Sequence, residues 1–150
     1  MVSREIVIDP SVAAMWFLPD ELSARAEELL DALLNRKVTA AVPAPWFYEV
    51  LNTLRVAVRR GRLTTEEAHG RIEHLARIPV ESSPAHAEGY GTLLALALEH
   101  GLTAYDAAYL ALARAHGAQL VTGDNDLLRL RPRFPWIVSL EDFCAQLDEA

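Results

Sequence analysis

Short apolar runs alternate along this chain with longer segments in which apolar residues recur every three or four positions. The short β-branched runs predict strands, and the helical spacing of the longer segments predicts amphipathic helices. The strands that we expect cover residues 5–8, 38–42, 78–80, 119–122 and 137–139. The helices that we expect begin near Ser11 and then cover 21–35, 45–60, 64–76, 83–100, 103–116 and 141–147.

Residues at the helix ends support several of these elements. Pro45 suits a first helical turn, and Thr64 has a glutamate three residues later, as in a capping box. Gly101 and Gly117 are expected to end the helices before them. The alternation of strands and helices predicts an α/β fold, a three-layer α/β/α sandwich with a central, mainly parallel sheet of about five short strands. Since no repeat or linker interrupts it, we expect one domain over 1–150.

The composition fits a globular protein, because 51% of the residues are hydrophobic and 23% are charged. No apolar run approaches the ~18 residues that a membrane span requires. No cationic segment leads into an apolar stretch at the N-terminus, so we expect no secretory signal. A single cysteine, Cys144, excludes an internal disulfide and makes the cytoplasm the expected compartment.

The formal net charge of −7 argues against tight, non-specific binding of nucleic acid through the protein's own charge. It leaves open an enzyme that meets phosphate groups through bound cations. The chain contains no Gly-x-Ser-x-Gly elbow and no phosphate-binding loop, which disfavours serine hydrolases and nucleotide cofactors. Zinc chemistry is also disfavoured, because no zinc-site spacing links the five histidines, which are His69, His74, His86, His100 and His116.

Two acidic residues stand where expected strands end. Asp9 follows the strand over 5–8, and Asp124 comes just after the strand over 119–122. Ligands of parallel α/β sheets bind beyond the carboxyl ends of the strands. Each residue also has a structural explanation, because Asp9 could cap a helix and Asp124 could belong to a turn. Asp126, which could cap a short helix after that turn, is a possible further ligand.

Two further acids fall in early helical turns. Glu49 lies at the border between the apolar and polar faces of the helix over 45–60, beside Thr53 and Val56. The helix dipole alone could explain a glutamate there. Asp106 has capping-box spacing from Thr103, but the rest of its helix is almost entirely apolar. A buried carboxylate in such a helix requires a partner, and a metal ion would supply one.

These four acids would interact strongly if the fold brought them together. Two unit charges ~4 Å apart repel by roughly 4 kcal/mol at an effective dielectric of 20. Such a group of carboxylates would raise the pKa values of its members or bind a cation. Oxygen ligands favour Mg²⁺ or Mn²⁺, ions that assist phosphodiester cleavage.

The segments around the acids are Ile-Val-Ile-Asp9-Pro-Ser-Val, Pro-Trp-Phe-Tyr-Glu49-Val-Leu-Asn, Leu-Thr-Ala-Tyr-Asp106-Ala-Ala-Tyr and Leu-Val-Thr-Gly-Asp124-Asn-Asp-Leu. In this order and spacing they resemble the motifs of PIN-domain ribonucleases, and most closely those of VapC-type toxins from bacterial toxin–antitoxin pairs. The resemblance extends from Val7 to about Leu140.

The resemblance implies a metal-dependent endoribonuclease in which Asp9, Glu49, Asp106 and Asp124 are catalytic and bind Mg²⁺ or Mn²⁺. It implies that Ser11 and Thr122 support the metal site, and it leaves open whether Asp124 or Asp126 is the nearer ligand. Its other implications are an RNA substrate, a homodimer and a VapB-type antitoxin partner. We expect water to attack the phosphorus with the help of one or two divalent ions, and the resemblance implies 5′-phosphate and 3′-hydroxyl ends.

Two groups of arginines are candidate contacts for RNA phosphates. One is at the end of the Glu49 helix, where Arg59 and Arg60 are the residues that we would test, and the other follows Asp124. A solvated helix face and a charged loop explain both groups as well.

Two other functions also remain open for the chain. It could be a phosphatase that uses Asp9 as a nucleophile, or a non-catalytic interaction module.

Overall fold

The computed structural model describes residues 3–84 and 89–150, and within them five parallel strands form one sheet. The strand order is β3-β2-β1-β4-β5, and every neighbouring pair is parallel. The strands are β1 (Arg4–Ile8), β2 (Val38–Pro43), β3 (Val80–Ser83), β4 (Gln119–Val121) and β5 (Ile137–Val138). This sheet confirms the predicted central parallel sheet.

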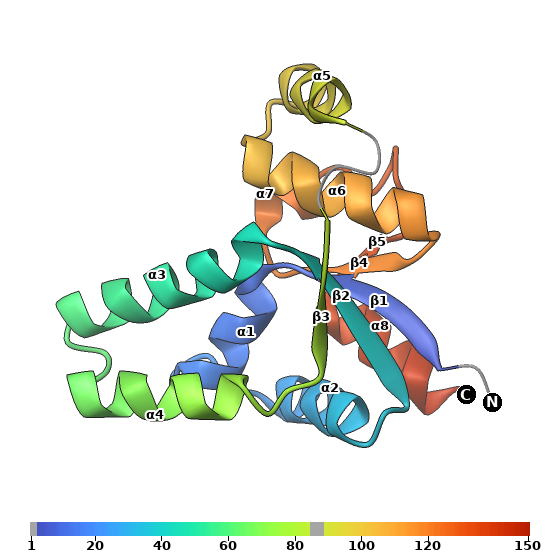
Figure 1. Ribbon diagram of the computed structural model, residues 1–150. Helices are drawn as coiled ribbons and strands as arrows, with labels where there is room; N and C mark the ends of the chain where they lie inside the picture. The colour runs from blue at the N-terminus through green and yellow to red at the C-terminus, as the bar shows by residue number, and fades with distance from the viewer. Residues whose placement is uncertain (1–2, 85–88) are drawn as a thin grey trace.

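Helices cover both faces of the sheet, as a three-layer sandwich requires (Figure 1). Helices α5 and α6 lie on one side, and α1, α2 and α8 lie on the other. Helices α3 and α4 form a pair that extends outward from the sheet. The described helices are α1 (Pro10–Phe17), α2 (Ala24–Leu34), α3 (Pro45–Arg59), α4 (Thr65–Leu75), α5 (Tyr90–His100), α6 (Ala104–His116), α7 (Asn125–Leu128) and α8 (Leu140–Asp148).

The central layer is buried because it is covered on both sides. Ile6, Val7 and Ile8 of β1 are fully buried, although successive side chains of a strand point to opposite faces. Helix α6 packs on the sheet with a continuous buried stretch from Ala107 to Ala113. The nearly apolar sequence of this helix correctly indicated a buried element.

Predicted helix ends agree with the structure where a specific capping residue marks them. Thr64 and Glu67 form a complete capping box before α4. Gly101 and Gly117 end α5 and α6 with φ values of 63° and 59°, a left-handed conformation that glycine adopts without steric cost. Pro45 begins α3, as predicted.

The segment before α5 was predicted wrongly. The third strand covers Val80–Ser83 instead of 78–80, and Ser83 belongs to that strand instead of opening a helix. A residue before proline favours extended backbone, which explains the conformation of Ser83 before Pro84. Helix α5 begins at Tyr90. Residues 85–88 of the predicted helix, with His86, lie outside the described residues.

Two smaller differences concern helix starts. The helix predicted to begin at residue 21 begins at Ala24, after Ser23, whose side chain accepts a hydrogen bond from the Ala26 amide. The short helix α7 is capped by Asp124, whereas the sequence suggested Asp126 as its cap. Asp124 thus has a structural role in addition to its place beside the sheet.

Candidate functional site

Asp9 and Thr122 lie side by side because β1 and β4 are neighbours in the sheet. Ile8, the last residue of β1, is in register with Val121, the last residue of β4. The residues that follow them therefore meet at the carboxyl edge of the sheet. Asp9 is only 2% exposed there, and the Thr122 hydroxyl donates a hydrogen bond of 2.7 Å to its Oδ2 atom.

Hydroxyl groups connect Asp9 to the loop after β4. The Ser11 hydroxyl donates to Asp9 Oδ1 and accepts a 2.8 Å hydrogen bond from the Gly123 amide. Thr122 Oγ1 accepts one of 2.9 Å from the Asp124 amide. Ser11 and Thr122 therefore hold both oxygens of the Asp9 carboxylate and the adjacent backbone in one arrangement.

Glu49 reaches the same edge from α3. It is partly buried at the border of the helix faces, as are Thr53 and Val56, which confirms the predicted position. Its Oε1 atom accepts a 2.9 Å hydrogen bond from the hydroxyl of Tyr109 on α6. This bond links α3 to α6 across the site. Tyr109 is fully buried, and the sequence analysis did not single it out. A feature of the sequence that could have indicated Tyr109 is its hydroxyl, three residues after Asp106 in a nearly apolar helix.

Asp106 lies in the first turn of α6, where Thr103 is the N-cap. The Thr103 hydroxyl accepts a 3.1 Å hydrogen bond from the Asp106 amide, so the predicted capping contact is present. This contact uses the backbone of Asp106. Thr103 also interacts with the Asp106 side chain, which is partly exposed at the end of a buried helix.

Asp124 and Asp126 differ in their surroundings. Asp124 Oδ1 accepts a 2.8 Å hydrogen bond from the Asp126 amide, and the Asp124 amide contacts Thr122. The Asp126 side chain is 73% exposed and lies 3.9 Å from the Arg129 guanidinium. Asp124 thus belongs to the hydrogen-bonded network around Asp9, whereas Asp126 points toward the surface.

The pKa values of three acids show that these carboxylates influence one another. Burial raises the pKa of Asp9 to about 7; the hydrogen bonds from Ser11 and Thr122 oppose this rise, and the charges of Asp124 and Asp106 add to it. Burial also raises the pKa of Glu49, against the Tyr109 hydrogen bond and with a contribution from Asp106.

Asp106 completes this electrostatic group. Burial is the largest cause that raises its pKa, the negative charges of Asp124 and Asp126 raise it further, and the hydrogen bond with Thr103 opposes the rise. The fold therefore brings together acids that lie far apart in the sequence, including Asp9 and Asp124, which the strand-end argument had placed at one edge of the sheet. Among the described residues, the groups that shift the pKa values of Asp9, Glu49 and Asp106 include no cationic side chain.

The acids do not by themselves form a closed metal site. In residues 3–84 and 89–150, no group of three or more acidic, histidine or cysteine side chains is arranged to hold a metal ion by itself. Mg²⁺ is often bound through one or two carboxylates and keeps several waters. Oxygen donors without a cationic partner, one of them buried with a raised pKa, fit such an ion chemically.

A cleft of about 620 Å³ adjoins the acids and shares Glu49 with them. Its other lining residues include Tyr48 and Asn52 from α3 and Tyr105 from α6. The sequence suggested no function for Tyr48 or Asn52, although Tyr48 is an aromatic residue directly before the candidate ligand Glu49.

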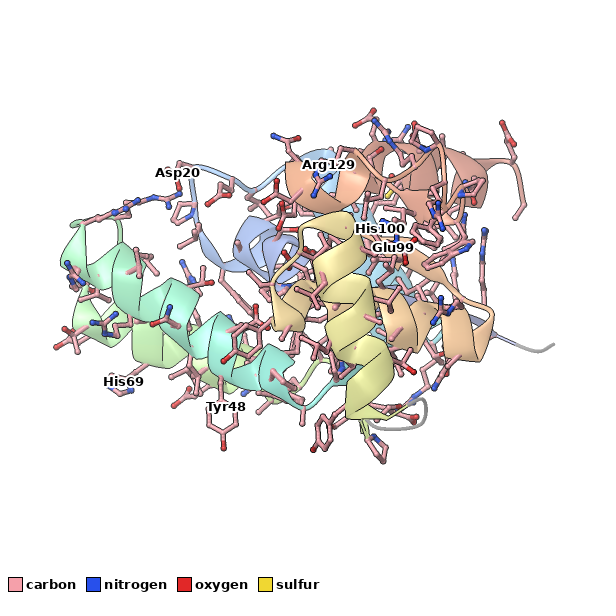
Figure 2. The ribbon with its side chains drawn as sticks, turned by 90° about the horizontal axis from the view of Figure 1, so that it is seen from above. Asp20, Tyr48, His69, Glu99, His100 and Arg129 are labelled. Carbon is pink, nitrogen blue, oxygen red and sulfur yellow. The ribbon has the colours of Figure 1, made fainter. Side chains whose placement is uncertain are left out.

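The arginine groups lie apart from the acids or are engaged elsewhere. Arg59 and Arg60 are exposed, and Arg59 follows Glu49 by ten residues, which is about 15 Å along a helix axis. In the second group, Arg129 donates to the His100 carbonyl at 2.6 Å, and Arg133 contacts Glu99 at 3.0 Å. Figure 2 shows Arg129, His100 and Glu99 close together, consistent with these contacts.

Comparison with known proteins identifies this arrangement. The family model described as "PIN domain" matches residues 6–131, which is most of the chain. The chain is also 37% identical over 141 residues to Ribonuclease VapC3 of Pyrobaculum aerophilum, a match that covers 90% of this chain and 98% of the relative. The chain belongs to the PIN-domain family, in its VapC ribonuclease group.

Solved structures of PIN-domain relatives agree with the fold. The crystal structure of PAE2754 from Pyrobaculum aerophilum has a TM-score of 0.71 at 25% identity, covering 99% of this chain and all of that chain. VapBC2 from Rickettsia felis, bound to a DNA fragment from its promoter, gives 0.63 at 16% identity, covering 90% of this chain and 96% of that one. PIN-domain ribonucleases depend on divalent metal ions. Among the described helices, each is too short or too polar to cross a membrane.

Proposed function

We propose that this PIN-domain protein cleaves RNA with a divalent ion, Mg²⁺ or Mn²⁺, held at the carboxyl edge of its sheet. The observation that carries the proposal is the buried carboxylate of Asp9. This carboxylate lies beside Thr122. Burial raises its pKa to about 7, and the negative charges of Asp106 and Asp124 add to the rise. A buried carboxylate without a cationic partner is costly, and binding a divalent ion would offset that cost.

The residues of the site have two kinds of proposed role, as metal ligands and as positioning residues. Asp9, Asp106 and Glu49 are the proposed ligands, and Asp124 completes the set. The link from Asp124 to Thr122 supports Asp124 over the more exposed Asp126 as the nearer ligand. Ser11 and Thr122 are positioning residues, because their hydroxyls orient the carboxylate of Asp9. Tyr109 positions Glu49 in the same way.

The bound ion would supply the positive charge that activates water and stabilises the developing negative charge on phosphate. Asp9 at the end of β1 and Asp106 in the first turn of α6 would hold that ion, so the scissile phosphodiester would lie between these two elements. As the resemblance to the PIN-domain family implies, the expected products are 5′-phosphate and 3′-hydroxyl ends. A 2′,3′-cyclic phosphate would contradict this scheme.

We also propose a VapB-type antitoxin as the protein partner, a homodimer as the assembly and the cytoplasm as the location. A toxin–antitoxin complex from Klebsiella pneumoniae contains a chain of the same fold, with a TM-score of 0.60 at 18% identity over 90% of this chain and 97% of that one, which supports the first. Leu94 and Leu98 on α5 are 60% and 75% exposed, and an exposed apolar helix face supports self-association. One domain over 1–150 stays a prediction.

The experiment compares the wild-type chain with Asp106→Asn on single-stranded RNA. We expect cleavage by the wild type only with Mg²⁺ or Mn²⁺, its loss on chelation, and its loss in the variant while the circular dichroism spectrum is unchanged. Release of phosphate from small monoesters would instead indicate a phosphatase. Absence of both activities in the wild type would indicate an interaction module.

A further inference from the structure

The cleft beside Glu49 differs chemically from the acidic edge that it adjoins. Glu49 is the only charged residue among those that line it, and the other walls come from tyrosine, asparagine, threonine, proline and alanine side chains. A pocket for a phosphate group would require cations or several backbone amides. These walls instead suit an uncharged, flat group.

Two exposed tyrosines stand at this cleft, on different helices. Tyr48 is 76% exposed and Tyr105 is 56% exposed. Figure 2 shows Tyr48 extending outward from α3. Each tyrosine directly precedes a candidate metal ligand, Glu49 on α3 and Asp106 on α6. On each of these two helices, an aromatic side chain at the cleft is thus the sequence neighbour of a candidate metal ligand.

Asn52 adds a hydrogen-bonding group to the same wall. Its Oδ1 atom accepts a 3.3 Å hydrogen bond from Arg55, which leaves the amide N–H groups to donate. Thr53 is engaged differently, because its hydroxyl donates to the Glu49 carbonyl at 3.0 Å. Asn52 is therefore the side chain best suited to contact a polar edge of a bound group.

We propose that this cleft binds one unstacked base of single-stranded RNA next to the bond that is cut. The inference rests on the nuclease function proposed above. The tyrosines would stack on the base, and Asn52 would donate to an acceptor on its edge. Sequence-tolerant stacking on aromatic side chains is the usual way in which proteins hold single-stranded nucleic acid. Paired bases of a duplex cannot enter such a cleft without leaving the stack.

The test uses Tyr48→Ala, Tyr105→Ala and the corresponding phenylalanine variants in the full chain. Both tyrosines are exposed, so the variants should fold, which circular dichroism and Tm will check. With a short single-stranded oligoribonucleotide, each alanine variant should raise KM roughly tenfold and change kcat less. The phenylalanine variants should stay near the wild type. Tyr90→Ala, an exposed tyrosine of α5 that does not line the cleft, is the matched control.

A binding measurement separates this inference from the catalytic proposal. With divalent ions chelated, an oligoribonucleotide carrying 2-aminopurine should lose fluorescence on binding the wild type, because stacking quenches this base. The quenching should disappear in Tyr48→Ala and Tyr105→Ala. If the wild type cleaves RNA but these variants keep its KM and its quenching, the base site is wrong and the nuclease stands. If the wild type never cleaves but shows tyrosine-dependent quenching, the nuclease is wrong and the base site stands.

Two further outcomes would overturn the base site. One is equal binding of a duplex of the same sequence with the same dependence on both tyrosines. The other is that Tyr48→Ala and Tyr105→Ala lose binding to an antitoxin peptide while their RNA binding and their KM for RNA stay unchanged. That result would make the cleft a protein-docking surface. An Asn52→Ala variant then sharpens the result, because it should change the preference among the four bases while quenching remains.

Discussion

Asp9 and Asp20 are both aspartates near α1, but their surroundings are opposite. Asp20 is exposed and accepts hydrogen bonds of 2.7 Å and 3.2 Å from Arg62, which lowers its pKa. Asp9 is buried against Ser11 and Thr122, and burial raises its pKa to about 7. An arginine neutralises the first carboxylate locally, whereas the second stays without such a partner. The comparison indicates that unneutralised, buried acids mark the functional part of this molecule.

The largest expected effect comes from removing the charge of Asp9. Asp9→Asn should reduce metal-dependent RNA cleavage by about a thousandfold, since the charge of a proposed ligand of the ion is lost. Asp20→Asn should leave cleavage within about twofold, because an exposed ion pair contributes little and lies outside the site. Initial rates on one RNA substrate measure both. Equal losses of cleavage rate in the two variants would show that Asp9 and Asp20 do not differ in their importance for cleavage.

Folding stability should reveal the same contrast through its pH dependence. The pKa of Asp9 is higher in the folded state than in the unfolded chain, so the unfolded state binds fewer protons between pH 4 and 7. Stability from this group is therefore fully present below about pH 4 and is lost as pH rises through about 7, by about 2–4 kcal/mol in all.

Denaturant unfolding of the metal-free protein from pH 4 to 8 measures this loss. Asp9→Asn should flatten the decline, and Asp20→Asn should not. Adding Mg²⁺ or Mn²⁺ at pH 8 should raise the Tm of the wild type more than that of Asp9→Asn. A decline that is identical in all three proteins would show that Asp9 does not carry it.

A smaller effect is expected at Thr122, which touches the site only through Asp9 and the Asp124 backbone. Thr122→Val keeps the shape of the side chain but removes its hydroxyl, so cleavage should fall about tenfold. Thr122→Ser should restore most of the rate, because its hydroxyl can make the same bonds. If valine and serine behave alike, the hydroxyl does not position Asp9.

The smallest effect concerns the exposed arginines at the end of α3. If Arg59 and Arg60 contact RNA phosphates, charge reversal at both should weaken RNA binding a few-fold and reduce the slope of log K against log salt by about 0.7 per contact. Arg77→Glu, an exposed arginine after α4, is the control. An unchanged salt slope would leave Arg59 and Arg60 as part of a solvated helix face.

The sequence predicted the sheet, and the positions of Asp9 and Asp124 after its strands, because those features depend on local patterns. Buried parallel strands appear as short β-branched runs, and ligands follow the carboxyl ends of such strands. Glycine and threonine caps predicted helix ends for a similar reason. The third strand was misplaced because it is a partly polar edge strand, whose position is set by pairing with β2.

Features that depend on three-dimensional contact could not be predicted in this way. Nothing local indicates that the Tyr109 hydroxyl meets Glu49, because 60 residues separate them. The cleft beside Glu49 likewise combines Tyr48 and Tyr105 from two helices. Neither the capping of α7 by Asp124 nor its link to Thr122 could be distinguished from a simple turn.

The register that pairs the end of β1 with the end of β4 also bears on when this protein can act during its synthesis. Asp9 and Thr122 are 113 residues apart in the chain, and their hydrogen bond requires both strands to be in place. Since a ribosome releases the N-terminal part first, a nascent chain carries Asp9 and Glu49 long before β4 exists. The acidic edge is assembled only after β4 docks beside β1. A nascent chain that still lacks β4 therefore also lacks the Thr122 hydroxyl that holds Asp9.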